Sequence, residues 1–244
     1  ATTRLDPRVL HKMMPYLQGE YGNASSLYRI GRRSREAVEA ARRQVAECLS
    51  AQPEEIFFTS CGTESDNWAI KSAAEQYASK GRHIITTAVE HHAVLHTCAH
   101  LERQGYTVTY LPVDGEGCVQ LSALERALRS DTILVSVMMA NNEVGTIEPI
   151  ANIRDMLRPR GILFHVDAVQ AAGNLSLDVT DLGADLLSLS AHKFYGPKGV
   201  GCLYIRKGVQ TPSFLDGGAQ ERGMRAGTEN VAGIVGMGEA LRLV

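Results

Sequence analysis

The stretch LSLSAHKFYGPKGVG, residues 187–201, joins an aliphatic run to a histidine, a lysine and a glycine-rich loop. A lysine at the end of a buried strand is costly unless its amine has a partner or a use. We therefore expect Lys193 to face a functional crevice, where partial desolvation lowers its pKa and frees the amine for a covalent bond or a proton transfer. If this position is considered alone, the alternative to a functional role is a lysine whose ammonium group extends to water.

Around this stretch, short apolar runs alternate with amphipathic ones along most of the chain. Continuous apolar strands joined by helices predict an α/β fold with a mostly parallel central sheet and helices on both faces. In such a sheet, ligands bind beyond the carboxyl ends of the strands. Helices are predicted at 31–50, 63–80 and 91–104, and strands at 56–60, 83–88, 106–111, 133–140, 162–167, 186–190 and 200–205.

The composition is that of an ordinary globular chain of 244 residues, with 44% hydrophobic and 21% charged residues. A net charge of −2 argues against a surface built to hold nucleic acid or an anionic membrane. No apolar run approaches the ~18 residues of a membrane helix, and no signal peptide opens the chain. The five cysteines form no C-x-x-C pair, so we expect a reducing, cytoplasmic setting without a disulfide framework or a zinc ribbon.

A possible phosphate cup follows the 56–60 strand, where Gly62 frees the backbone. We expect Thr63 to cap the next helix, with Asp66 closing the capping box. A phosphate at such a helix start would meet free N–H groups and the positive end of the helix dipole. An ordinary capped helix without a ligand is the alternative.

Two further residues stand where strands end. Asp167, at the tip of the 162–167 strand, is either a solvated carboxylate or the partner of a buried cation. His91 lies at a strand-to-helix junction, from which its ring could lie flat over a planar ligand. Together with Lys193 and the phosphate cup, these residues meet the needs of pyridoxal 5'-phosphate, whose pyridinium nitrogen requires an acidic partner. We therefore predict this cofactor.

No metal site is predicted. His92, His96 and His100 are spaced four apart and would share one helix face. That face lacks an obvious carboxylate ligand, and simple surface histidines are commoner than a histidine metal site.

Six motifs, in order along the chain, resemble the signatures of cysteine desulfurases of NifS/IscS type. This family belongs to the class V aminotransferase branch of the fold-type I pyridoxal phosphate enzymes. The resemblance implies that residues 1–244 form the cofactor-binding large domain. It also implies that the N-terminal strand and the C-terminal small domain, with its nucleophilic cysteine loop, are missing. The motifs are TSCGTESDN (59–67), EHHAVLHTC (90–98), ANNEVGT (140–146), FHVDAVQ (164–170), LSLSAHKFYGPKGVG (187–201) and QERGMRAGTEN (220–230).

At the ring of the cofactor, the resemblance assigns a role to five residues. Lys193 would hold the cofactor covalently and later move the α-proton of the substrate. His91 would stack on the ring and assist proton transfers. Asp167 would hold the pyridinium nitrogen, and Gln170 would hydrogen-bond the ring hydroxyl oxygen. Asn142 would sit beside the cofactor oxygen and the substrate carboxylate.

The resemblance also assigns residues that would hold the phosphate of the cofactor. Four of them come from the subunit that binds the cofactor, and one comes from the second subunit of a homodimer. The first four are Gly62, Thr63, Ser190 and His192. Thr228 would reach the phosphate of the other subunit in a homodimer.

The implied reaction removes sulfur from L-cysteine, leaving L-alanine and an enzyme persulfide for iron–sulfur cluster assembly or another acceptor. The implied partners are a second copy of the chain, an iron–sulfur scaffold or other acceptor protein, and, as one option, a second fragment with the C-terminal domain. None of the five cysteines matches the family's nucleophile, and we interpret Cys61 as a small residue packed in the cup. Two alternatives stay open: a selenocysteine lyase or aminotransferase of the same fold, and a non-catalytic assembly protein.

Overall fold

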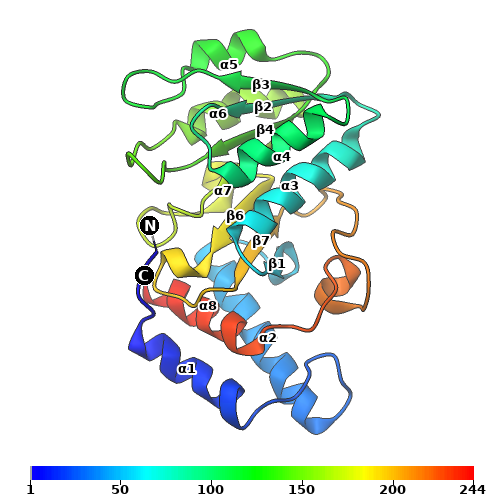
Figure 1. Cartoon of the computed structure of the whole chain (residues 1–244), viewed down its shortest axis with the longest axis vertical. Helices are drawn as coiled ribbons and strands as arrows, with labels where there is room; N and C mark the ends of the chain where they lie inside the picture. Colours follow the sequence, from blue (N-terminus) through cyan, green and yellow to red (C-terminus); the bar gives the residue numbers. More distant parts are fainter. Residues whose placement is uncertain (1) are drawn as a thin grey trace.

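The computed structural model describes residues 2–244 and contains one seven-stranded sheet (Figure 1). The strand order is β1-β7-β6-β5-β4-β2-β3. All neighbouring strands from β6 to β3 pair in parallel, and only β7 runs antiparallel to its neighbours β1 and β6. The predicted mostly parallel sheet is thereby confirmed. The strands are β1 (Ile56–Thr59), β2 (His83–Thr87), β3 (Thr107–Leu111), β4 (Thr132–Met138), β5 (Leu163–Asp167), β6 (Leu186–Ser190) and β7 (Gly201–Ile205).

The helices form layers over this sheet, and each of the three predicted from periodicity is present as α2, α3 or α4. Helices α1 and α8 pack against each other beside α2 at one end of the molecule (Figure 1). Among the described residues, no helix is both long enough and apolar enough to cross a membrane. The helices are α1 (Pro7–Gln18), α2 (Arg29–Cys48), α3 (Gly62–Tyr77), α4 (His92–Glu102), α5 (Leu121–Ala127), α6 (Ile150–Leu157), α7 (Val179–Leu182) and α8 (Val231–Leu243).

Two hydrophobic clusters lie on opposite faces of the sheet. One gathers the inward side chains of α3 and α4, and the other those of α2, α5, α6 and α8. Ile84 and Ile85 are adjacent in β2 and fully buried, yet they belong to different clusters. Successive side chains of a strand point to opposite faces, so a strand buried on both sides is mostly apolar along its length. This is why the strands were visible in the sequence as continuous apolar runs.

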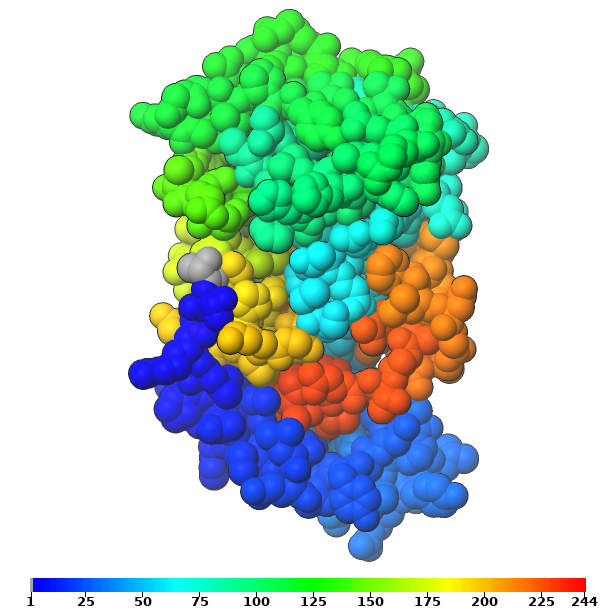
Figure 2. All heavy atoms as spheres, in the orientation of Figure 1, coloured from blue at the N-terminus to red at the C-terminus, as the bar shows by residue number. Residues whose placement is uncertain are grey.

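The N-terminal segment lies across the loop that carries Lys193. The backbone amide and the hydroxyl of Thr3 both donate to the carbonyl oxygen of His192, at 2.9 and 3.0 Å. The amide of Tyr195 in turn donates to the Thr3 hydroxyl at 2.6 Å. Figure 2 shows the blue N-terminal segment lying against the yellow part of the chain that contains this loop. The loop is thus fixed by residues that are nearly the whole chain away in sequence.

Trp68 of α3 provides a test of the packing. Its side chain is fully buried, and its ring lies 5.5 Å from that of Phe57 and 5.6 Å from that of Phe214. We expect Trp68→Ala to lower the free energy of unfolding by about 3–5 kcal/mol, because it removes these contacts and leaves a cavity. Urea denaturation measures this. The control Leu17→Ala, at a side chain that is 58% exposed, should change stability by less than about 0.5 kcal/mol. Equal effects would contradict the assigned core.

Candidate active site

A cavity of about 160 Å³ opens at the carboxyl ends of β4, β5 and β6, beside the start of α3. Nine of the ten predicted site residues line it, and only Thr228 does not. Thr228 is exposed and borders a separate hollow of about 120 Å³ together with Ser60 and Arg225. The residues that line the larger cavity are Cys61, Gly62, Thr63, Asp66, His91, Met138, Asn142, Asp167, Val169, Gln170, Ser190, His192 and Lys193.

The start of α3 forms one wall of the cavity, and its N–H groups have no side-chain cap. The capping residue is Cys61, so the predicted capping box of Thr63 and Asp66 is wrong. The Glu64 carboxylate instead accepts a hydrogen bond from the Ser60 amide at 2.9 Å, outside the helix. The first N–H groups of α3 are therefore left for an anion.

Gly62 allows the helix start to approach the neighbouring strands closely. A Cβ atom at this position would lie 2.6 Å from Val169 Cγ2 and 3.3 Å from Ser190 Cβ. The Ser190 hydroxyl is buried and has no hydrogen-bond partner among the described residues. A buried hydroxyl without a partner is costly, so this oxygen indicates a place where a ligand can bind.

Asp167 and Gln170 supply polar groups at the other side of the cavity. Asp167 is 4% exposed and accepts a hydrogen bond from the Val169 amide at 2.9 Å. Burial raises the pKa of Asp167 to about 6, while the Val169 amide and the charge of Lys193 act in the opposite direction. The Gln170 Oε1 atom is buried without a hydrogen-bond partner among residues 2–244.

His91 lies at the mouth of the cavity and caps α4. Its Nδ1 atom accepts a hydrogen bond from the Ala93 amide at 3.1 Å, which leaves the proton of the neutral ring on Nε2. Partial desolvation lowers the pKa of His91, and the neighbouring His92 and Lys193 lower it further. The ring is therefore neutral at neutral pH, with one donor nitrogen available to a ligand.

Lys193 ends a short 3-10 helix, η3 (Ala191–Lys193), that follows β6 directly. The buried side chain of Phe194 anchors this turn, and the Gly196 amide closes it by donating to the Ala191 carbonyl at 2.9 Å. A Cβ atom on Gly196 would lie 2.8 Å from that carbonyl oxygen, so a side chain would not fit there. The glycine-rich sequence after Lys193 thus fixes the lysine at the strand end.

Three buried titratable groups lie at or near the cavity wall, and the sequence alone showed no sign of this cluster. Burial, followed by the charge of Asp167, raises the pKa of Asp66 well above its usual value. Burial also raises the pKa of Glu90, to about 8, and lowers that of His165 to about 3. Asp66 Oδ1 lies 3.6 Å from His165 Nε2, but the pKa shifts of both groups favour their neutral forms. Asp167, whose pKa is raised only to about 6, is therefore the buried carboxyl group of this region that most readily carries a charge.

We expect Asp66→Asn to stabilise the chain increasingly as the pH rises. Folded Asp66 stays protonated, whereas the unfolded side chain ionises above about pH 4. Its raised pKa therefore costs stability as the pH rises through this window, by up to about 1.4 kcal/mol per pH unit. Asn is neutral throughout, so the difference between variant and wild type should grow as the pH rises above about 4, where the unfolded side chain ionises, in urea denaturation.

Asp155→Asn is the matched control for this experiment. Asp155 is exposed and accepts a hydrogen bond from Arg154, which lowers its pKa. It is ionised in both the folded and the unfolded chain above about pH 5, so its effect should not depend on pH there. A pH-independent effect of Asp66→Asn would contradict the assignment of a protonated Asp66.

The sequence profile of the family Aminotransferase class-V matches residues 1–244. The chain belongs to the class V aminotransferase family. Enzymes of this family, the cysteine desulfurases among them, use pyridoxal phosphate. Membership also accounts for the fold, since class V aminotransferases combine a mostly parallel sheet with covering helices.

Two curated proteins of the family show how similar this chain is to known members. It is 55% identical over 243 residues to cysteine desulfurase IscS of Clostridium botulinum strain Hall, covering 100% of this chain and 61% of that protein. It is 57% identical to cysteine desulfurase IscS of Methanosarcina thermophila, covering 100% of this chain and 60% of that protein. The chain thus spans about three fifths of the length of these relatives.

Solved structures of the family agree closely with this fold. A NifS-like protein that is 48% identical matches with a TM-score of 0.97, over 99% of this chain and 67% of that chain. A structure described as SspA in complex with cysteine is 39% identical and matches with a TM-score of 0.95, over 98% of this chain and 70% of that chain.

Proposed function

We propose that residues 1–244 form the pyridoxal phosphate-binding large domain of a cysteine desulfurase, which removes sulfur from L-cysteine and leaves L-alanine. The observation that carries the proposal is the cavity in which Lys193, Asp167 and the uncapped start of α3 face the same space. The names of the curated relatives and the cysteine in the SspA structure support the same substrate.

The residues of the cavity fit this cofactor. A phosphate needs several donors, and the start of α3, Thr63, His192 and the unpartnered Ser190 hydroxyl supply them. A protonated pyridine nitrogen needs a carboxylate, and Asp167 is the charged one of its cluster. The buried Gln170 amide oxygen lacks a partner that a ring hydroxyl would provide.

The proposed role of each residue follows from its position in the cavity. When bound, the cofactor supplies an electron sink for the charge that remains after the substrate loses its α-proton. Lys193 would hold the cofactor and would then take up that proton. The negative charge of Asp167 would keep the ring nitrogen protonated, and His91 would offer the cofactor a neutral imidazole. Asn142, at the edge of the cavity, binds the substrate carboxylate.

The sulfur must then be received by a thiolate, and we propose that this thiol lies on a segment outside residues 1–244. Burial raises the pKa of Cys98 to about 12 and that of Cys202 further still. The pKa values of Cys48 and Cys118 are also raised, by desolvation and by nearby carboxylates. Cys61 lies at the phosphate end of the cavity, beside the start of α3. A nucleophilic thiol requires a lowered pKa, so Cys48, Cys98, Cys118 and Cys202 are not suited to the task, and the phosphate of the cofactor would lie between Cys61 and the substrate.

We further propose a homodimer that hands its sulfur to an iron–sulfur scaffold or to another acceptor protein in the cytoplasm. The exposed Thr228, which lies outside the cavity of its own chain, supports the dimer because it is free to reach a partner's phosphate. The five unpaired cysteines support a reducing compartment.

We expect the chain, loaded with pyridoxal phosphate in deuterated water, to exchange the α-hydrogen of L-cysteine for deuterium, because Lys193 can remove and return that proton. Proton NMR of the amino acid measures the exchange. Lys193→Ala should exchange at least about 100-fold more slowly, since general acid–base catalysis contributes that much or more. Lys198→Ala is the matched control, because Lys198 is an exposed lysine in the same loop, and it should exchange like the wild type.

Exchange that survives Lys193→Ala, or a cofactor-saturated wild type that exchanges nothing, would refute the proposal. Conversion of the amino acid to a keto acid with amination of the cofactor would instead identify an aminotransferase.

A further inference from the structure

Strand β1 leads directly into the phosphate end of the cavity, and it is an edge strand of the sheet. Charged side chains occupy the hydrogen-bonding positions that a further strand would fill. The Ile56 carbonyl accepts from Arg42 at 2.7 Å and from Arg222 at 2.8 Å. The Phe58 amide donates to the Glu221 carboxylate at 2.8 Å. Backbone groups at a free edge need hydrogen-bond partners. These side chains therefore fix the strand that leads to the phosphate end of the cavity.

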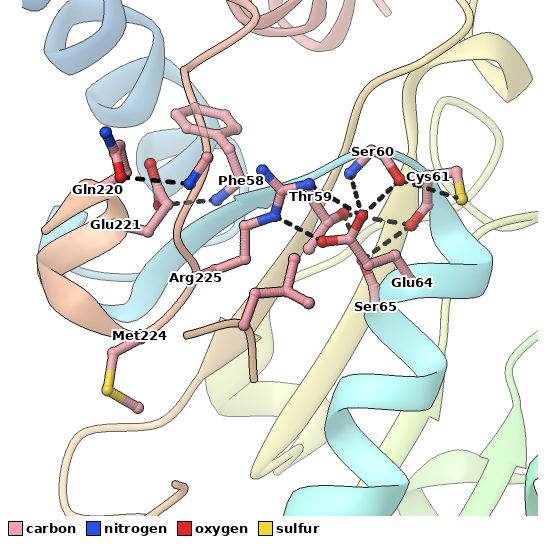
Figure 3. Close-up of polar contacts among 12 residues, drawn as sticks. Phe58, Thr59, Ser60, Cys61, Glu64, Ser65, Gln220, Glu221, Met224 and Arg225 are labelled. Atoms are coloured by element: carbon pink, nitrogen blue, oxygen red, sulfur yellow. Dashed lines mark hydrogen bonds and ion pairs between the residues drawn. The ribbon is translucent and has the colours of Figure 1, made fainter. Parts of the chain in front are cut away.

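A further contact of this kind joins Glu64 to Ser60, the residue that directly follows β1 (Figure 3). Its carboxylate accepts from the amide of Ser60 at 2.9 Å and also from the Ser60 hydroxyl. The same carboxylate forms a two-point ion pair with Arg225, at 2.7 Å to Nε and 3.1 Å to Nη2. Glu64 is 13% exposed and Arg225 is 20% exposed, so the pair is largely shielded from water.

The ion pair joins two segments that are distant in sequence. Glu64 lies in the first turn of α3, and Ser60 directly precedes its capping residue Cys61. Arg225 belongs to a segment whose backbone is strained, because Glu221 and Arg222 have φ angles of 44° and 57°. A strained backbone persists only where its surroundings hold it, and the two ion pairs Arg42–Glu221 and Glu64–Arg225 provide that support.

We propose that Glu64 and Arg225 act as positioning residues for the phosphate of the cofactor. This inference rests on the proposed function. By holding Ser60, Glu64 fixes the Cys61–Thr63 backbone from outside the cavity, so that its N–H groups converge on the phosphate without moving when it binds. Arg225 fixes the orientation of Glu64 and neutralises a negative charge that would otherwise face the phosphate. Neither side chain lines the cavity, so both act through the backbone that they hold.

The affinities of pyridoxal phosphate and of pyridoxal, the same aldehyde without the phosphate, test this role. Equilibrium dialysis of each compound with the wild-type chain, Glu64→Gln and Arg225→Gln measures the dissociation constants. We expect both variants to bind pyridoxal phosphate about tenfold more weakly, which corresponds to one lost charge-assisted hydrogen bond. Binding of pyridoxal should change by less than about twofold, which also shows that the variants are folded.

The two variants together separate positioning from simple electrostatics. If only the charges mattered, Glu64→Gln would bind the phosphate compound more tightly and Arg225→Gln more weakly, because one removes a negative charge and the other a positive one. Effects of opposite sign would therefore overturn the proposal, as would an equal loss for both compounds. Glu239→Gln is the matched control, since it breaks the Glu239–Arg242 ion pair, whose two residues both lie in α8 and do not line the cavity, and it should change neither affinity.

The result for the wild type separates a failure of the proposed function from a failure of the positioning role. A wild-type chain that binds pyridoxal phosphate no better than pyridoxal has no phosphate site, and the proposed function itself then fails. A wild type that prefers the phosphate compound, with the same preference in both variants, would overturn only the role of Glu64 and Arg225.

Discussion

The desolvation of carboxyl groups at the carboxyl ends of β4, β5 and β6 is the constraint on which the site depends. Asp66, Glu90 and Asp167 are buried within the same region of the fold, and three negative charges cannot be held there together. The Val169 amide and Lys193 favour the charged form of Asp167 alone. The other two acids stay protonated, so the cavity presents a single negative charge opposite a lysine.

The sheet makes this arrangement possible because its parallel strands end at one edge. Asp167 ends β5, Ser190 ends β6, and Met138 ends β4. The antiparallel β7 brings β1 to the edge of the sheet, so that the start of α3 faces the same cavity from the side. Edge strands are exposed to unwanted pairing, and here charged side chains of α2, α3 and the 220–225 segment satisfy the free edge of β1. The same contacts that protect the edge hold the phosphate end of the cavity.

Much of the fold could be predicted because buried parallel strands are continuous apolar runs. The strands and helices from α2 to β7 that periodicity indicated are all present, and the residues after the strands do line one cavity. The predicted capping of α3 was wrong, because the helix begins at Gly62, so that Cys61 is the capping residue and Thr63 already lies inside the first turn. Helix α8 was not predicted, because its three glycines and its largely buried surface give it no clear polar face.

Other features depend on contacts between distant residues and leave no local signal. Thr3 fixes the loop of Lys193 across nearly the whole length of the chain. The sequence pattern indicated a helix-capping role for Asp66, and only its burial next to Asp167 makes it part of the site. Such couplings follow from the fold and can be recognised only once the fold is known.

The central claim is that this cavity binds pyridoxal phosphate through Lys193. Borohydride reduction of the cofactor-loaded chain, followed by intact mass analysis and peptide mapping, tests it most directly, because reduction makes a lysine adduct permanent. The account predicts one cofactor per chain, attached to the peptide that contains Lys193 and absent from Lys193→Ala. An adduct spread over surface lysines, or one that is unchanged in Lys193→Ala, would contradict it.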